Sequence, residues 1–291
     1  MIKVEPFYDK NTGTGSYVVY DDTSRAALII DAVLNFDVAS GRLEFALANQ
    51  QLQFIEAQKL HLDYICETHA HADHLSAAAY LRQHSKARTV ISQGIGEVQQ
   101  QFSRRFNKPV TEDQTLLYDI LVHDGDTLML GKHTLTVMTT PGHTPDSVSY
   151  LIEGNIFVGD TLFMPDIGTA RCDFPGGDAH QLYQSIQKIH ALPDETRIWV
   201  CHDYPPPNRK VQLNTLVKTS RNENIHVNQS MSEADFVTLR TQRDATLNVP
   251  RLLYPALQVN LWGALLPEKE AGGQRFIKIP LIVDEDSYAT Q

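Results

Sequence analysis

One short segment constrains this chain more than any other. Its six residues, His69-Ala70-His71-Ala72-Asp73-His74, carry three histidines and an aspartate. Side chains two residues apart in an extended chain point to the same side, so the imidazoles of His69 and His71 can reach one metal ion. Asp73 and His74 follow where the chain turns and can serve a neighbouring position. This crowding of nitrogen and oxygen donors indicates a metal site rather than a polar surface loop.

The residues on both sides place this segment on a loop between a strand and a helix. Residues 62–67 form an apolar run that predicts a strand, and residues 75–82 are rich in Ala and Leu, which favours a helix. Upstream, residues 16–20 and 26–31 predict a hairpin-like pair of strands, and the apolar spacing over 44–60 predicts a helix. Loops at strand ends are where open α/β sheets place their ligands.

The second half of the chain is richer in strands. Short apolar runs separated by glycine and proline predict a meander, with strands at 127–130, 135–138, 147–152 and 155–158. A helix over 179–192 and a buried strand over 197–201 follow. Two β-rich blocks, each closed by a helix, are compatible with an αβ/βα sandwich. We expect one domain over residues 1–291, with a mainly helical extension from about residue 205 that finishes in a short strand at 277–279.

Three further polar residues follow apolar strands in this second half. They are His143 in Pro141-Gly142-His143-Thr144, Asp160 in Gly159-Asp160-Thr161, and His202 in Cys201-His202-Asp203. Each taken singly is more often a turn or cap residue. Because they occur together at successive strand ends after a histidine-rich loop, they predict one shared site. The remaining histidines lack such neighbours, and we expect them in surface or core roles: His61, His84, His123, His133, His180, His190 and His226.

Composition excludes several other classes of function. The chain is 42% hydrophobic and 21% charged, as in a globular protein, and its net charge of −10 with scattered Lys and Arg argues against nucleic-acid binding. It has neither a signal-peptide pattern nor the roughly 18 apolar residues of a membrane span, so we expect a cytoplasmic protein with no membrane partner. Cys66, Cys172 and Cys201 lack paired spacing, which predicts free thiols. The absence of a Ser-His-Asp or phosphate-loop motif argues against covalent nucleophilic catalysis.

The ordered motifs from His69 to His202 resemble the metallo-β-lactamase superfamily, and the match spans roughly residues 12–204. The resemblance implies an α/β fold, a four-layer αβ/βα sandwich with the metal at one edge. Within the superfamily, residues 67–69, 157–163 and 168–174 look like the persulfide dioxygenases. These are relatives of glyoxalase II that oxidise glutathione persulfide to sulfite. Residues 168–174 are the most diagnostic of the three segments.

The resemblance also implies a set of metal ligands. The persulfide dioxygenases hold one Fe(II) per chain, with ligands that correspond here to His69, His143 and Asp160. Two histidines and one carboxylate on one face are also the donors of non-haem iron oxygenases, because they leave positions for O₂ and substrate. The other donors, His71, Asp73, His74 and His202, would orient these ligands or hold a second metal.

Alternatives remain open at this stage. Asp73, His74 and His202 resemble the second-metal ligands of glyoxalase II, so a dinuclear thioester hydrolase, with zinc or another metal pair, is the second hypothesis. A non-catalytic metal-binding protein would have lost ligands, and none is lost. Arg171 is a candidate for gripping a substrate carboxylate, with an internal ion pair as its alternative role, and Tyr204 is a second candidate for substrate contact. We expect a small-molecule thiol persulfide and O₂ as partners, and a homodimer.

Overall fold

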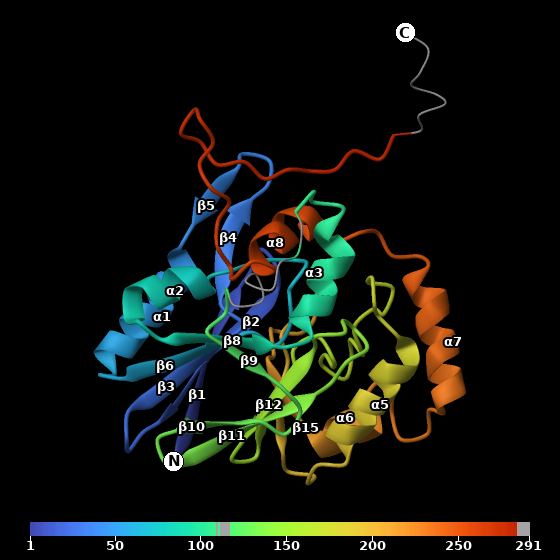
Figure 1. The fold of residues 1–291 in the computed structure, drawn as a ribbon. Helices are drawn as coiled ribbons and strands as arrows, with labels where there is room; N and C mark the ends of the chain where they lie inside the picture. The colour runs from blue at the N-terminus through green and yellow to red at the C-terminus, as the bar shows by residue number, and fades with distance from the viewer. Residues whose placement is uncertain (109, 111–116, 284–291) are drawn as a thin grey trace.

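Two β-sheets packed face to face form the centre of the computed structural model, which describes residues 1–108, 110 and 117–283 (Figure 1). The first sheet has the strand order β1-β2-β3-β6-β8-β9, with β1 (Ile2–Asp9), β2 (Thr14–Asp21), β3 (Ala26–Ile30), β6 (His61–Cys66), β8 (Arg88–Ser92) and β9 (Ile120–Val122). The second has the order β10-β11-β12-β13-β14-β15, with β10 (Thr127–Leu130), β11 (His133–Thr139), β12 (Val148–Ile152), β13 (Asn155–Phe157), β14 (Arg197–Trp199) and β15 (Asn214–Leu216). A small third sheet joins β5 (Arg42–Glu44), β4 (Val33–Asp37) and β7 (Leu75–Ser76).

The two large sheets are held together by apolar side chains that alternate along each strand. In β2, Tyr17 and Val19 face the second sheet, whereas Val18 faces the helices on the outside. This follows from the pleat, which turns successive side chains to opposite faces. The ring of Tyr17 lies 5.3 Å from that of Phe157 across the interface. Burying each such side chain stabilises the fold by roughly 1.5–3 kcal/mol.

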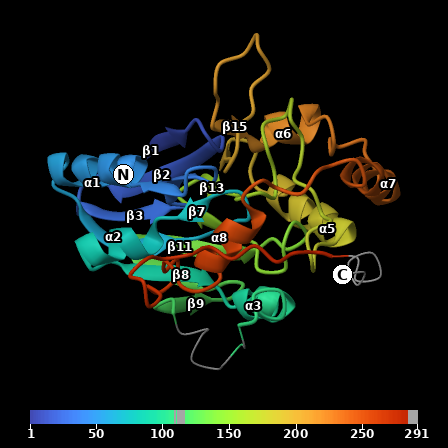
Figure 2. The same ribbon diagram turned by 90° about the horizontal axis from the view of Figure 1, so that it is seen from above.

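Helices cover the outer face of each large sheet, which gives four layers (Figure 2). The first sheet is covered by α1 (Ala46–Ala57), α2 (Ala78–Ser85) and α8 (Leu253–Asn260), with α3 (Ile95–Ser103) beside α8. The second is covered by α5 (Ala179–His190), α6 (Val217–Glu223) and α7 (Glu233–Asp244). The predicted αβ/βα sandwich is thus confirmed. None of the helices in the described part of the chain is long and apolar enough to cross a membrane.

Most of the predicted elements form, with two corrections. The helix expected from Leu75 begins only at Ala78, because Leu75 and Ser76 pair as a short strand with β4. The strand expected at 277–279 does not form; there, Lys278 exchanges two backbone hydrogen bonds with the Gln258 side chain of α8 instead. After residue 205 the described chain holds β15, the three helices α6, α7 and α8, and connecting loops.

The sheet topology brings particular strand ends to one edge of the sandwich. Strands β3 and β6 are parallel neighbours in the first sheet, and β13 and β14 are parallel neighbours in the second. Parallel neighbours end at the same edge of their sheet, and the loops that follow them are where α/β proteins place ligands. The histidine-rich loop after β6 therefore meets Asp160 after β13 and His202 after β14 at the seam between the sheets.

Candidate metal centre

The predicted metal-ligating side chains converge at this seam, in two groups. The first group is His69, His143 and Asp160, and the second group is His71, Asp73, His74 and His202. Within each group, one ligand atom of every residue lies within 4.8 Å of the others. The histidine-rich loop supplies one member of the first group and three members of the second, so neither group can assemble without both sheets.

The first group presents two imidazoles to one carboxylate. Oδ2 of Asp160 lies 3.6 Å from Nε2 of His143 and 3.9 Å from Nε2 of His69. Nδ1 of His143 donates to the Arg171 carbonyl oxygen at 2.7 Å; a carbonyl can only accept, so Nε2 carries the free lone pair. Burial, together with the neighbouring His71 and His143, holds the pKa of His69 well below its usual value. Neutral imidazoles of this kind are suited to binding a metal.

The second group is linked by ion pairs. Nε2 of His202 lies 3.0 Å from Oδ2 of Asp73 and 3.3 Å from Oδ1 of Asp160, and Nδ1 of His74 lies 3.3 Å from Oδ1 of Asp73. Burial lowers the pKa of His202, but Asp160 and Asp73 more than offset this effect and raise it to about 9. Asp160 thus directs one oxygen toward each group, which is the arrangement of a carboxylate that can bridge two metals.

Two glycines allow the ligand-bearing turns to pack this closely. Gly142, just before His143, has φ of +134°, and a Cβ on it would lie 2.2 Å from the backbone nitrogen of Leu182. Gly159, just before Asp160, has φ of +52°, and a Cβ there would lie 2.5 Å from Oγ1 of Thr68. Only glycine fits such positions without a shift of the backbone. The glycines of the Pro-Gly-His and Gly-Asp motifs therefore have a steric role beside the ligands.

A buried carboxylate that sequence reasoning missed holds the histidine-rich loop from below. Asp31 accepts hydrogen bonds from the backbone N–H and the hydroxyl of Thr68, at 2.7 and 3.0 Å, and lies 3.0 Å from Nε2 of His71. Glu67 lies 3.5 Å from the same nitrogen. Burial lowers the pKa of His71, but the two carboxylates outweigh burial and raise it well above its usual value. Asp31 ends an apolar strand just as Asp160 does, so the same pattern could have identified it.

Asn260, at the end of α8, holds the loop from the other side. Its Nδ2 donates to the carbonyl oxygens of His71 and His74, both at 2.8 Å, and its Oδ1 accepts from the backbone N–H of Ser76 at 2.8 Å. Oδ2 of Asp146 accepts from the backbone N–H of Ala70 at 2.8 Å. Nothing in the sequence links a single asparagine near the C-terminus to this loop, so no pattern could have found it.

Buried ligand atoms without partners show that a metal fits this site. Three of them have no hydrogen-bond partner among the described residues: Nε2 of His69, Nδ1 of His71 and Nε2 of His74. Nδ1 of His74, Nε2 of His202 and Oδ1 of Asp160 make only the ion-pair contacts given above. A buried polar atom left without a hydrogen bond costs about 1–3 kcal/mol. A metal ion that accepts these lone pairs removes the cost. Imidazole and carboxylate donors of this kind suit iron and zinc.

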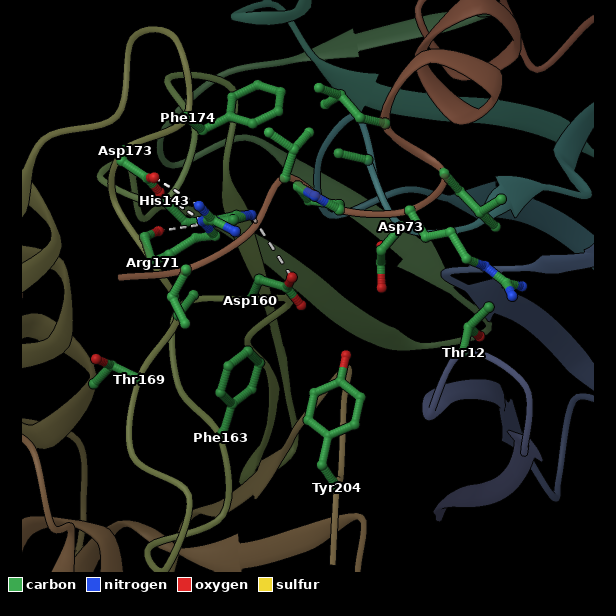
Figure 3. A pocket seen from close by; sticks show the side chains of 18 of the residues that line it. Thr12, Asp73, His143, Asp160, Phe163, Thr169, Arg171, Asp173, Phe174 and Tyr204 are labelled. Carbon is green, nitrogen blue, oxygen red and sulfur yellow. Dashed lines mark hydrogen bonds and ion pairs between the residues drawn. The ribbon is translucent and has the colours of Figure 1, made fainter. Parts of the chain in front are cut away.

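The site opens into a pocket of about 610 Å³. Asp73, His143 and Asp160 line its inner end, with the ring of Phe174 near His143 and the ring of Phe163 near Asp160 (Figure 3). Residues 169–173 contribute one wall, with the exception of Cys172. The outer rim includes side chains that sequence reasoning missed: Arg105, Arg243, Leu247, Val249 and Arg251. The arginines at this rim are exposed. The guanidinium groups of Arg243 and Arg251 form no hydrogen bond or ion pair within the described part of the chain.

The two candidates for substrate contact, Arg171 and Tyr204, both line this pocket. The guanidinium of Arg171 makes a bidentate ion pair with Asp173, at 2.5 and 2.6 Å, and donates to the Asn248 carbonyl oxygen at 2.7 Å. Its fork is therefore engaged within the chain, as the internal ion-pair alternative describes. Tyr204 is half exposed and stacks on His202, with the rings 5.6 Å apart and nearly parallel.

Asp203, which follows His202 in the sequence, binds Arg209 rather than a metal-ligating side chain. The ion pair is bidentate, at 2.7 and 2.9 Å, and Arg209 also binds Asp166. The side chain of Arg209 is largely buried. The three cysteines are free and buried, as predicted.

The fold and the donor set define a metal-dependent enzyme of the αβ/βα sandwich class. The family model described as the metallo-beta-lactamase superfamily matches residues 11–202, and the chain belongs to that superfamily. It is 44% identical to the "Probable metallo-hydrolase" of Burkholderia pseudomallei, over 96% of this chain and 98% of that one. It is 33% identical to a hydroxyacylglutathione hydrolase of Shewanella, over 69% of this chain and 68% of the other. Among solved structures, ETHE1 from Myxococcus xanthus has a TM-score of 0.72 at 27% identity, covering 90% of this chain and 100% of the other.

Proposed function

We propose that this protein oxidises a low-molecular-weight persulfide with O₂ at one Fe(II) per chain, held by His69, His143 and Asp160. One observation carries the proposal. Two donors of the first group, His143 and Asp160, line the inner end of a pocket, and the ligand atom of His69 lies within 4.8 Å of theirs. Most residues of 168–174, the segment most typical of persulfide dioxygenases, contribute one of its walls. Two histidines and a carboxylate leave further coordination positions open to O₂ and substrate.

The overall reaction is RSSH + O₂ + H₂O → SO₃²⁻ + RSH + 2 H⁺. The S–S bond breaks, the outer sulfur is oxidised, and O₂ accepts the electrons. Bound iron would supply adjacent positions for O₂ and the persulfide anion, so that the two react in place. Phe163 and Phe174 give this end of the pocket an apolar lining. The Tyr204 hydroxyl is directed toward the space between Asp73 and Asp160 (Figure 3), where it can donate a hydrogen bond to the substrate.

The extent of the similarity supports this choice over hydrolysis of glutathione thioesters. The likeness to ETHE1 spans 90% of the chain, whereas the likeness to the hydroxyacylglutathione hydrolase of Shewanella spans 69%. Substrate selection depends on the pocket wall and rim, and these come partly from residues 243–253. A relative that matches 69% of the chain is a weaker guide to the substrate than one that matches 90%.

The rim of the pocket favours an anionic thiol carrier. Arg105, Arg243 and Arg251 are exposed there, in a chain whose net charge is −10. A guanidinium without an internal partner can bind a carboxylate through two parallel hydrogen bonds. Glutathione carries two carboxylates at a distance from its sulfur. We therefore propose glutathione persulfide as the substrate, with the carboxylates at the arginine rim and the outer sulfur at the first group.

Metal analysis combined with product analysis tests the proposed activity. Protein purified without added metal is expected to hold one iron per chain and to release sulfite from glutathione persulfide, with matching consumption of O₂. A hydroxyacylglutathione thioester serves as the comparison substrate. Two metals per chain and thioester cleavage without O₂ consumption would reject the dioxygenase.

A dinuclear thioester hydrolase is the second candidate, and one observation favours it. All four donors of the second group are present, and Asp160 directs one oxygen to each group, 3.6 Å from Nε2 of His143 and 3.3 Å from Nε2 of His202. A metal pair bridged by this carboxylate would activate water and polarise the thioester carbonyl. The metal count per chain separates this candidate from the first.

Substitutions at the rim test the substrate. Replacing Arg251 or Arg243 by Gln is expected to raise KM for glutathione persulfide about 10–100-fold, because a charge-assisted contact is worth about 1.5–3 kcal/mol. A small alkyl persulfide without a carboxylate should be unaffected. Arg171→Lys is the comparison: because of the ion pair with Asp173, it should damage both substrates equally and lower the Tm. A KM effect of Arg171→Lys confined to glutathione persulfide would instead return Arg171 to the substrate site.

A further inference from the structure

The pocket wall at residues 168–172 is held by the C-terminal part of the chain. Asn224 donates to the Gly168 carbonyl oxygen at 3.1 Å, and His226 accepts from the backbone N–H of Thr169 at 3.0 Å. In α7, Arg240 donates to the Thr169 carbonyl oxygen at 3.1 Å, and Asp244 accepts from the backbone N–H of Cys172 at 2.7 Å. All four contacts are buried, and all four side chains lie beyond residues 11–202, which the family model matches.

One peptide unit in this wall connects α7 to a metal ligand. The Cys172 N–H that Asp244 binds belongs to the same peptide as the Arg171 carbonyl that accepts from Nδ1 of His143 at 2.7 Å. In a trans peptide the N–H and the C=O point in opposite directions, so the carboxylate and the imidazole bind opposite sides of one planar group. The other oxygen of Asp244 accepts from Arg240, which fixes the carboxylate.

We propose that Asp244 is a positioning residue for His143 and acts through the peptide between Arg171 and Cys172. Hydrogen bonds in series polarise one another, so a carboxylate on the N–H makes the carbonyl a stronger acceptor. A stronger acceptor fixes the Nδ1–H form of His143 and keeps Nε2 directed at Asp160. In many metal sites a carboxylate binds the ligating imidazole directly; here a peptide unit lies between them. The inference rests on the proposed metal site. It gives α7 a function, which is to support that site.

The burial of the ion pair between Arg240 and Asp244 indicates that Asp244 positions His143 rather than only stabilising the fold. Both Arg240 and Asp244 are almost fully buried, at 1% and 4% exposure. Removing two charges from water costs about as much as their attraction returns, so such a pair is weak evidence for stability alone. Both oxygens of Asp244 have defined partners, and one of those partners leads to His143 within two hydrogen bonds.

The test is the metal affinity of the full-length protein with Asp244→Asn, a change that keeps the shape of the side chain. The metal-free protein is titrated with Co(II), whose visible absorption reports bound imidazole. Loss of a partner one step from a ligand typically weakens metal binding about 10–100-fold, and we expect a shift in that range. Co(II) affinity within threefold of wild type in a folded Asp244→Asn protein would overturn the proposal.

Two matched variants distinguish an effect on the position of His143 from an effect on the stability of the protein. Asp194→Asn removes the ion pair with Arg221. Within the described part of the chain, Asp194 makes no hydrogen bond or ion pair with residues 168–173, so Co(II) affinity should stay unchanged. Arg240→Lys should lower the Tm while Asp244 keeps its bond to Cys172, so affinity should stay within about threefold of wild type. Equal weakening in all three variants at equal losses of Tm would mean a structural role only.

If Asp244→Asn does not fold, the wild-type protein provides the test. NMR of the metal-free protein should show His143 protonated at Nδ1, with a slowly exchanging proton; the Nε2-protonated form would overturn the proposal. These readouts require no persulfide chemistry. A wild-type protein that binds Co(II) tightly but releases no sulfite would therefore reject the proposed function and leave the role of Asp244 standing.

Discussion

The two ligand groups of the metal centre are held in place by different kinds of contact. In the first group, His143 and His69 are oriented by uncharged acceptors, the Arg171 carbonyl and the Thr68 hydroxyl, at 2.7 and 3.1 Å. In the second group, carboxylates lie on the imidazoles: Asp31 on His71 and Asp73 on His202, both at 3.0 Å. In the first group only Asp160 shares an ion pair, through Oδ1 with His202 at 3.3 Å, and its Oδ2 faces His143 and His69. The second group must exchange the pair of Asp73 with His202 for a metal.

This difference teaches that seven possible ligands need not form two equal sites. A metal entering the first group would bind Oδ2 of Asp160, while Oδ1 can keep its contact with His202. A metal entering the second group would compete with His202 for Asp73, whose Oδ2 lies 3.0 Å from the imidazole. We therefore expect tight binding of the first metal and weaker binding of a second, with the dioxygenase as the form that fills one site.

The largest expected effect comes from removing a first-group ligand. Replacing His69, His143 or Asp160 by Ala should abolish metal binding and activity, because an open site with two remaining protein ligands holds too few donors. Metal content of the purified variants and sulfite release are the measurements. His84→Ala, which changes an exposed histidine, is the control. Full iron occupancy in His143→Ala would refute the assignment of the first group.

A smaller effect is expected from the second group. Asp73→Ala and His202→Ala should reduce activity about 10–100-fold and leave one metal bound, since these residues orient the first site or hold a weaker second one. Metal content and kcat are compared with those of the wild-type protein. If either variant loses all metal, the two groups form one interdependent centre, and the difference between them disappears.

The support of the loop should matter more for the second group than for the first. Asn260→Ala removes three buried hydrogen bonds to the histidine-rich loop and should lower the free energy of unfolding by about 3 kcal/mol. Because the loop carries three members of the second group, affinity for a second metal should fall more than affinity for the first. Gln258→Ala, on the same helix but with exposed contacts, is the control. An equal loss at both sites would contradict this expectation.

The smallest effect is expected from mild acid. It should separate two buried residues that support the site: His226, which binds the pocket wall at Thr169, and Asn260, which binds the histidine-rich loop. Burial, with Arg240 and Arg243 nearby outweighing Asp244, lowers the pKa of His226 from 6.5 to about 4. Below pH 6.5 the unfolded chain binds a proton that the folded protein excludes, so stability is complete above pH 6.5 and falls between pH 6.5 and 4. The loss from this residue is at most about 3 kcal/mol.

The measurement is denaturant unfolding at several pH values. His226→Gln should remove part of the slope between pH 6.5 and 4. His190, whose pKa burial also lowers to about 4, should contribute a similar slope without touching residues 168–172. An unchanged slope in His226→Gln would mean that His226 is not neutral in the folded protein. Asn260 does not titrate, so its hydrogen bonds to the histidine-rich loop should not change between pH 6.5 and 4.

The fold and the ligand set were predictable because both depend on local patterns. Alternating apolar residues determine the strands, and the glycines before His143 and Asp160 mark tight turns at their ends. The helix at Ala78 was placed too early because a two-residue strand forms only through pairing with β4, which no local propensity reveals. Pairing between distant segments overrides helix propensity at such a position.

The residues that support the metal ligands were mostly unpredictable, because they too act between distant segments of the chain. Asn260 and Asp244 act through backbone groups that lie far away in the sequence, and backbone acceptors leave no residue pattern. Arg171 shows the opposite case, since its sequence context indicates a functional loop but cannot reveal that Asp173, two residues later, already binds its guanidinium. The rim arginines are scattered single residues until α7 and α8 bring them to one pocket.

The position of the metal centre at the seam makes any bound ion a cross-link between the two halves of the protein. His69 follows the first sheet, and Asp160 follows the second, so separating the sheets releases the metal. Mass action then ties thermal unfolding to free metal: at one hundred times the dissociation constant, binding adds about 2.7 kcal/mol to the folded state. Cells short of the metal would hold this enzyme in a more easily degraded form, and its abundance would follow the metal supply even at constant synthesis.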